Sequence, residues 1–179
     1  MICPGHGPVI DTAIKEQISI YRKFASESLP SNDFKRVTIV YCSAYGYTKE
    51  MATYLKNRYE KDGKQVSFYE IDALNYASLK DKIINDIRLS GTILLGSPTI
   101  VGDAVSLFYD LLSSLTWTLG QGKHASVFGD YGWSGEAVRN LSDRLTELHF
   151  SVIGGFRYNF KIDDQGYKEL DEYYSRLIK

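Results

Sequence analysis

The run Gly91-Thr92-Ile93-Leu94-Leu95-Gly96-Ser97 limits the possible folds of this chain more than any other segment. It carries almost no polar side chains, so neither face of a strand built from it can lie in water. Strands of this kind are typical of parallel sheets, because helices cover both faces of such sheets. The run therefore predicts a central strand of an α/β protein.

Strand and helix patterns alternate along most of the chain. Strands are predicted at 36–42, 66–71, 91–97, 123–128 and 151–162, the last being extended or split. Apolar residues recur at helical spacing at 47–62, 76–87, 105–115, 137–148 and 170–177. Such alternation implies right-handed crossovers and a doubly wound, five-stranded parallel sheet.

The first 35 residues do not follow this alternation. Residues 1–10 form a Pro/Gly-containing loop by composition, 14–24 a short amphipathic helix, and 28–33 a linker. With 179 residues, the chain is expected to form one domain at 36–179. Residues 1–35 are then the tail of a different domain.

Charge and composition exclude several classes of function. A net charge of −1 with mixed signs gives no electrostatic case for nucleic-acid binding. The N-terminus does not resemble a signal peptide, and no apolar run approaches the roughly 18 residues of a membrane span. The two cysteines, Cys3 and Cys42, lie far apart, which favours a reducing cytoplasm, and Cys42 is expected to serve packing.

A hydroxyl-rich loop, Ser43-Ala44-Tyr45-Gly46-Tyr47-Thr48, joins the first strand of the sheet to the helix at 47–62. The N–H groups and the positive dipole end of a helix N-terminus attract anions, and hydroxyls add donors. The loop lacks the glycines of a dinucleotide fingerprint and the Gly-Lys-Ser/Thr of a Walker loop. It therefore predicts a site for a single terminal phosphate.

Two further loops are expected at the same edge, because parallel strands place their carboxyl ends together. One begins Ser97-Pro98-Thr99-Ile100, and the other reads Gly129-Asp130-Tyr131-Gly132-Trp133-Ser134-Gly135. Glycines let the backbone approach a ligand, and aromatic side chains stack on planar rings. Together with a phosphate loop, these features predict a flavin mononucleotide (FMN) pocket.

In this order, the three loops resemble those of the flavodoxin-like family, and most closely those of the flavodoxin domain of flavodiiron proteins (A-type flavoproteins). The resemblance covers residues 36–179 and implies a sheet with strand order 2-1-3-4-5. It implies that FMN is held by two groups of residues: Ser43, Ala44, Tyr45, Gly46, Tyr47 and Thr48 at the phosphate, and Ser97, Pro98, Thr99, Ile100, Gly129, Asp130, Tyr131, Gly132 and Trp133 around the ring. Val101 stands where the family often has asparagine.

The segment from Cys3 to Ile10 resembles the end of the metallo-β-lactamase-like domain that precedes the flavodoxin domain in flavodiiron proteins. His6 matches an iron ligand of that family. The chain has three histidines and no His-x-Glu-x-Asp-His cluster, so no metal site is predicted within it. No catalytic residue is predicted either.

The resemblance implies an FMN-binding electron-transfer domain of a flavodiiron-type oxygen or nitric oxide reductase. The electron donor would be a rubredoxin or a flavin reductase. The resemblance is compatible both with a di-iron partner subunit and with a head-to-tail homodimer. Asp103, Asp130 and Glu136 are expected near the ring, where negative charge lowers the reduction potential of a flavin.

Two alternatives stay open from the sequence. One is a stand-alone flavodoxin or an NAD(P)H- or quinone-type flavin reductase. The other is an interaction domain without a cofactor, because a fold does not fix a function. A response-regulator receiver is excluded, because the ends of its first and third strands need acidic residues where this chain has Tyr41-Cys42-Ser43 and Ser97-Pro98.

Overall fold

A computed structural model describes residues 1–27 and 31–178. The chain divides into two compact units, Met1–Pro30 and Ser31–Lys179. The sequence placed the boundary between residues 35 and 36, and in the structure the first strand of the sheet begins at Asp33.

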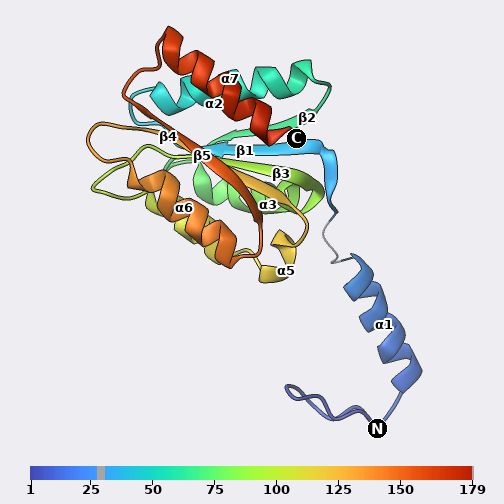
Figure 1. The fold of residues 1–179 in the computed structure, drawn as a ribbon. Coiled ribbons are helices and arrows are strands. Elements are labelled where there is room, and N and C mark those ends of the chain that lie inside the picture. Colours follow the sequence, from blue (N-terminus) through green and yellow to red (C-terminus); the bar gives the residue numbers. More distant parts are fainter. Residues whose placement is uncertain (28–30, 179) are drawn as a thin grey trace. The chain divides into compact units, whose positions relative to one another are not determined.

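The larger unit is built on a five-stranded parallel sheet (Figure 1). Its strands are β1 (Asp33–Tyr41), β2 (Gln65–Glu70), β3 (Ser90–Gly96), β4 (His124–Tyr131) and β5 (Ser151–Asn159). They lie in the order β2-β1-β3-β4-β5. The predicted doubly wound α/β fold and its strand order are confirmed.

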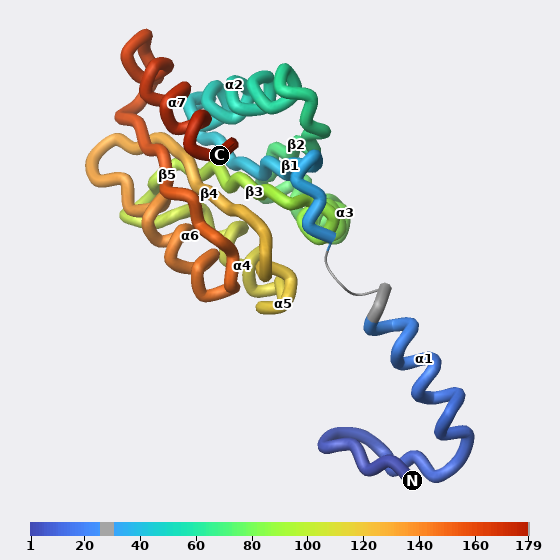
Figure 2. Tube along the Cα trace, turned by 45° about the vertical axis from the view of Figure 1, so that its right-hand side comes forward, coloured from blue at the N-terminus to red at the C-terminus, as the bar shows by residue number. Residues whose placement is uncertain are grey.

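Helices cover both faces of the sheet (Figures 1 and 2). On one face lie α2 (Tyr47–Lys61) and α7 (Asp164–Leu177), and on the other α3 (Tyr76–Leu89), α4 (Ser106–Ser113) and α6 (Glu136–Glu147). Each face has its own hydrophobic cluster. Met51 of α2 and Leu170 of α7 belong to one, and Ile83 of α3 and Leu141 of α6 belong to the other.

The central position of β3 explains its composition. All seven of its residues are buried, as the apolar run predicts. The outer strands β2 and β5 are only partly buried, so their sequences are more polar.

Three details differ from the sequence-based expectations. Residues 151–159 form one strand with a register shift near Gly154, whose φ of 55° favours glycine. A short helix, α5 (Trp117–Gly120), precedes β4 and had no signal in the hydrophobic pattern. Finally, β4 runs on to Tyr131, so part of the predicted loop after it is strand.

Lys123, just before β4, is fully buried. Its ammonium group donates hydrogen bonds to the carbonyl oxygens of Ser31 (2.5 Å), Arg88 (3.0 Å) and Ser90 (2.5 Å). These bonds connect Ser31, where the sheet unit begins, to the junction of α3 and β3. Burial lowers the pKa of Lys123 to about 8.

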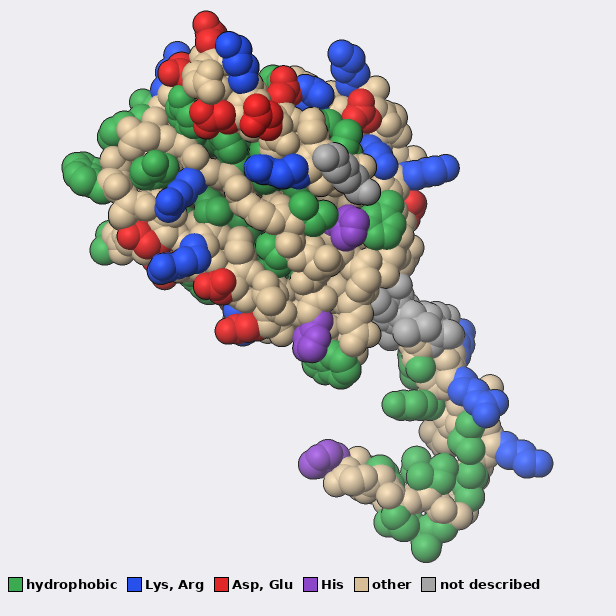
Figure 3. Space-filling model, viewed as in Figure 1, with side chains coloured by type: hydrophobic (Ala, Val, Ile, Leu, Met, Phe, Trp, Pro, Cys, Tyr) green, Lys and Arg blue, Asp and Glu red, His purple; other side chains and the backbone are tan. Residues whose placement is uncertain are grey.

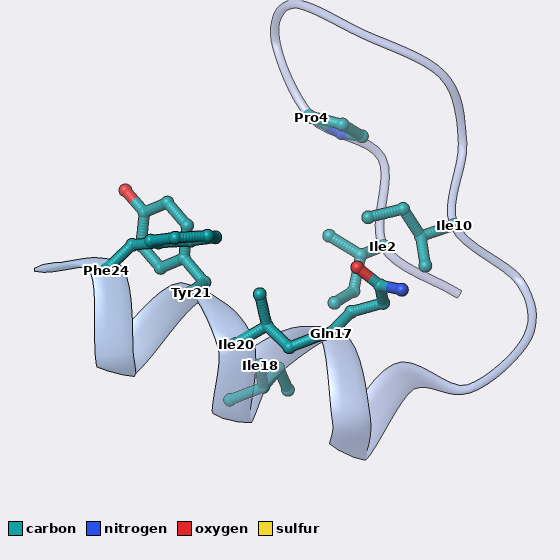
Figure 4. Close-up of a pocket in the computed structure, with 8 residues that line it drawn as sticks. All are labelled: Ile2, Pro4, Ile10, Gln17, Ile18, Ile20, Tyr21 and Phe24. Atoms are coloured by element: carbon teal, nitrogen blue, oxygen red, sulfur yellow. The ribbon is translucent and has the colours of Figure 1, made fainter.

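The smaller unit consists of an N-terminal loop and helix α1 (Ile14–Glu27). Ile2 and Ile10 pair as an antiparallel bridge and close the loop. Apolar side chains of the loop and of α1 line a groove of about 530 Å³ within this unit (Figure 4). The space-filling view shows these hydrophobic side chains on the surface of the unit, and acidic and basic side chains mixed over the sheet unit (Figure 3).

Candidate FMN site

The loops after β1, β3 and β4 meet at the carboxyl edge of the sheet, because these neighbouring strands are parallel. Backbone hydrogen bonds join neighbouring strands where the first two of these loops begin. The N–H of Ser97 donates to the carbonyl of Phe128 (3.0 Å), and the N–H of Cys42 donates to the carbonyl of Gly96 (2.9 Å). The three predicted loops therefore begin next to one another at this edge.

The loop after β1 leaves backbone donors available at the start of α2. Gly46 precedes the helix with a φ of 89°, and a β-carbon built on it would have no neighbour within 4 Å. The hydroxyl of Ser43 accepts from the N–H groups of Gly46 (3.0 Å) and Lys49 (3.3 Å). Within the part of the chain that the structure describes, the N–H groups of Tyr47 and Thr48 have no such acceptor. This arrangement suits a phosphate at the helix N-terminus.

The side chain of Thr48 lies deeper than the loop pattern suggests. It is fully buried, and its hydroxyl donates to the carboxylate of Asp130 at the end of β4. Asp130 is itself 7% exposed, and its carbonyl accepts from the N–H of Thr99 (2.9 Å). One residue therefore connects all three loops. Among the described residues the backbone N–H of Thr48 has no acceptor, whereas its hydroxyl has a partner in the protein.

The loop after β3 starts with a buried serine. Ser97 donates its hydroxyl to the carbonyl of Pro98 (2.9 Å) and accepts from the N–H of Val105 (3.1 Å). Gly129 of β4 approaches the Ser97 carbonyl so closely that a β-carbon on it would lie 1.8 Å from that oxygen. The two loops are thus packed backbone against backbone.

A tight hairpin follows, in which Ile100 and Asp103 exchange backbone hydrogen bonds of 2.8 and 3.1 Å. Its two central residues, Val101 and Gly102, both have positive φ, 52° and 75°. That turn type favours asparagine at its first central position, where this chain has a β-branched valine. The Val101 side chain is completely exposed, so no contact in the protein compensates for the strain.

The loop after β4 is held by residues of β5. The side-chain amide of Asn159 donates to the carbonyls of Tyr131 (3.2 Å) and Gly132 (3.1 Å). The guanidinium of Arg157 lies over the Tyr131 ring at 5.7 Å and donates to the Ser134 carbonyl (3.2 Å). These contacts fix the backbone on either side of Trp133. No sequence motif pointed to Arg157 or Asn159.

The exposed aromatic and apolar side chains of the three loops are available to a planar ligand. Trp133 is 94% exposed and Tyr45 83% exposed, while Tyr131 is half-buried and Ile100 is exposed. The remaining predicted residues, among them Ala44 and Pro98, lie in the same loops. The residues present therefore fit FMN, with N–H donors for a phosphate and aromatic walls for a ring.

The three acidic residues expected near the ring are all engaged by protein groups. Asp103 accepts from Tyr109 (2.5 Å) and Asn140 (2.9 Å), and these hydrogen bonds, that of Asn140 first, lower its pKa. Glu136 accepts from the Ser134 hydroxyl (2.7 Å), which lowers its pKa as well. Both carboxylates are thus stabilised in their charged form, and Asp103 holds the hairpin in place.

The N-terminal unit contains His6, which matches an iron ligand of the flavodiiron family. His6 is exposed in the loop between Ile2 and Ile10. Among the described residues, no group of three or more His, Cys, Asp or Glu side chains is placed to hold a metal ion. Likewise, none of the helices in the described ranges has the length and apolar character needed to cross a membrane.

The sequence matches the family model described as flavodoxin over residues 39–176. The type A flavoprotein fprA of Rhodobacter capsulatus is 33% identical over 151 residues, which cover 83% of this chain and 34% of the relative. The flavodiiron core of Flv1 from Synechocystis is 28% identical with a TM-score of 0.66, covering 97% of this chain and 42% of that one. An archaeal flavodoxin is 26% identical with a TM-score of 0.62. This match covers 78% of this chain and 93% of the archaeal chain.

The chain belongs to the flavodoxin family. It spans about a third of the length of the curated relatives that it matches. Together with the site geometry, these matches confirm the predicted class: a flavodoxin-like domain of the flavodiiron type, with FMN as cofactor and electron transfer as its role.

Proposed function

We propose that this chain is the flavin-carrying part of a flavodiiron-type oxygen or nitric oxide reductase. It would accept electrons from a rubredoxin or a flavin reductase and deliver them to a di-iron centre. The observation that carries the proposal is the meeting of the phosphate loop with two aromatic loops at one sheet edge. The names of the relatives, type A flavoprotein and flavo-diiron protein, support the wider context.

Bound FMN supplies one- and two-electron transfer, while the protein supplies position and electrostatics. The N–H groups of Tyr47 and Thr48, with the dipole of α2, would hold the phosphate. Tyr131 and Trp133 would border the ring. Because Trp133 is 94% exposed, this side of the site is open to a partner protein.

Two glycines on either side of α2 give a matched test. Gly46 and Gly63 flank the helix, both have positive φ (89° and 75°), and neither has a neighbour near its β-position. Alanine at either position costs about 1 kcal/mol through backbone strain. Only Gly46→Ala should also weaken FMN binding, by about tenfold. Of the two glycines, only Gly46 determines the backbone conformation of the proposed phosphate loop. Equal FMN affinities for the two variants would contradict the proposed phosphate site.

The purified protein should be yellow and absorb near 450 nm, as flavoproteins do. A colourless protein that takes up no added FMN would favour the alternative of an interaction domain without a cofactor. Rapid mixing with reduced rubredoxin, and separately with NADPH, distinguishes the remaining classes. Fast flavin reduction by NADPH alone would favour a stand-alone flavin reductase.

The proposal assigns residues 1–35 to the end of a metallo-β-lactamase-like domain. The Flv1 flavodiiron core covers 97% of this chain, whereas the sheet unit Ser31–Lys179 accounts for about 83% of it. The match therefore includes most of the N-terminal unit, which the archaeal flavodoxin, covering 78%, need not include. This difference favours the flavodiiron assignment over a stand-alone flavodoxin.

In that setting His6 would join an iron site whose other ligands come from a partner subunit. Native mass spectrometry that counts flavin, iron and chains in one complex tests this. A homogeneous species with flavin but without iron or a partner would contradict it. We further propose a cytoplasmic location, which agrees with the two free cysteines.

A further inference from the structure

Phe160, the residue that directly follows β5, has an unusual backbone conformation. Its φ of 56° lies in the left-handed region, which is rare for a bulky side chain. Glycine and asparagine adopt this region at a lower cost. The Phe160 side chain is also 49% exposed, so burial in a hydrophobic core does not account for an aromatic residue here. Such an outlier is a reason to look for a function of the side chain.

The Phe160 ring lies against the backbone of the loop after β4. A β-carbon built on Gly132 would lie 3.2 Å from Cζ and 3.3 Å from Cε1 of this ring. The N–H of Phe160 donates to the Tyr131 carbonyl (3.0 Å). The side-chain amide of the preceding residue, Asn159, donates to the carbonyls of Tyr131 and Gly132. The end of β5 therefore holds this part of the loop by three hydrogen bonds and one aromatic ring.

Trp133 follows directly in the loop and depends on this support. Because its side chain is 94% exposed, the protein contacts little of it, and its position is set by the backbone to which it is attached. The Phe160 ring packs on Gly132, one peptide unit away. A change in the Phe160 side chain should therefore reach Trp133 through the backbone.

We propose that Phe160 is a positioning residue for the ring part of the FMN site. Its ring restricts the movement of Gly132 and thereby keeps Trp133 where it borders the flavin. This role rests on the proposed function, in which Tyr131 and Trp133 border the flavin ring. The phosphate is held by a different loop, the one after β1, so the effect of Phe160 should concern the ring.

Phe160→Asn is the central variant, because asparagine tolerates the left-handed backbone and lacks the ring. Phe160→Tyr keeps an aromatic ring and should restore the wild-type behaviour. His149→Asn is the matched control, since His149 is exposed and also has a positive φ (64°), but precedes β5 at the other end of that strand. We expect both asparagine variants to unfold at the wild-type urea concentration or a higher one.

The affinities of the full chain for FMN and for riboflavin are measured by quenching of flavin fluorescence. Both ligands carry the ring, and only FMN carries the phosphate. Phe160→Asn should weaken both about tenfold, whereas Phe160→Tyr and His149→Asn should stay within about twofold of the wild type. Gly46→Ala, in the phosphate loop, should weaken FMN more than riboflavin. Wild-type affinities in Phe160→Asn, or a loss confined to FMN, would overturn the role of Phe160.

The flavin-free protein gives a second measurement. The heteronuclear NOE of the Trp133 backbone N–H reports its motion on the picosecond to nanosecond timescale, and Trp117, the other tryptophan, serves as the internal reference. The Trp133 value should fall in Phe160→Asn and be restored in Phe160→Tyr, while the Trp117 value stays constant. An unchanged Trp133 value would overturn the role of Phe160 even where flavin binds. A wild-type protein that binds neither flavin would contradict the proposed function instead, and the NMR comparison would still decide whether Phe160 holds the loop.

Discussion

The buried hydrogen bond between Thr48 and Asp130 leads to a specific prediction about the stability of the FMN-free protein. Thr48 was predicted as a phosphate ligand, yet its hydroxyl donates to a carboxylate 82 residues away. Valine has the shape of threonine without the hydroxyl. Thr48→Val therefore removes the donor while filling the same space, and it leaves the Asp130 carboxylate buried without this partner.

The size of the effect follows from burial. A hydrogen bond to a charged group contributes about 1.5–3 kcal/mol, and here Thr48 is fully buried and Asp130 is 7% exposed. We expect Thr48→Val to lower the free energy of unfolding of the FMN-free protein by about 2 kcal/mol. With an m-value of about 2 kcal/mol/M, the urea midpoint should fall by about 1 M.

Thr53→Val in the same helix is the matched control. Thr53 is exposed, and its hydroxyl donates to the Lys49 carbonyl (2.8 Å), so its loss should change stability by less than about 0.5 kcal/mol. The opposite result would be a Thr48→Val variant whose FMN-free form is as stable as before and which only binds FMN more weakly. In that case the hydroxyl serves the phosphate and not Asp130.

Three further predictions test the loops and the entry of the sheet unit. Val101→Asn should raise the free energy of unfolding by about 1 kcal/mol through relief of strain, while Val101→Thr, still β-branched, should bring no gain in urea titrations. Gly129→Ala should cost more than 2 kcal/mol and much FMN affinity, because its β-carbon would meet the Ser97 carbonyl at 1.8 Å, and intact flavin spectra would contradict this. Burial lowers the pKa of Lys123 to about 8, below its unfolded value of 10.5. Between these two values the unfolded state binds more protons, so the free energy of unfolding should rise from about pH 8 to 10. Lys123→Met should flatten this rise in thermal unfolding, and parallel profiles would refute the role of Lys123.

The fold was predictable because burial leaves a clear pattern in side chains. The apolar run of β3 and the stripe of α2 follow directly from which faces lie inside. The start of β1 was not predictable in this way. Asp33 pairs with Ser90 through the backbone, but Asp33, Phe34 and Lys35 are all exposed, so no hydrophobic pattern marks them as strand.

The site was predictable as a set of loops and not as a set of contacts. Residue types were enough to propose a phosphate loop and two aromatic loops, since N–H donors, glycines and ring faces are properties of short segments. The role of Asp130 depends on tertiary structure, because its side chain binds Thr48 and its backbone binds Thr99. These two bonds connect the phosphate loop to the ring loops through one residue. A change at Asp130 should therefore alter phosphate and ring binding together, and the two parts of the FMN site should not behave as independent subsites.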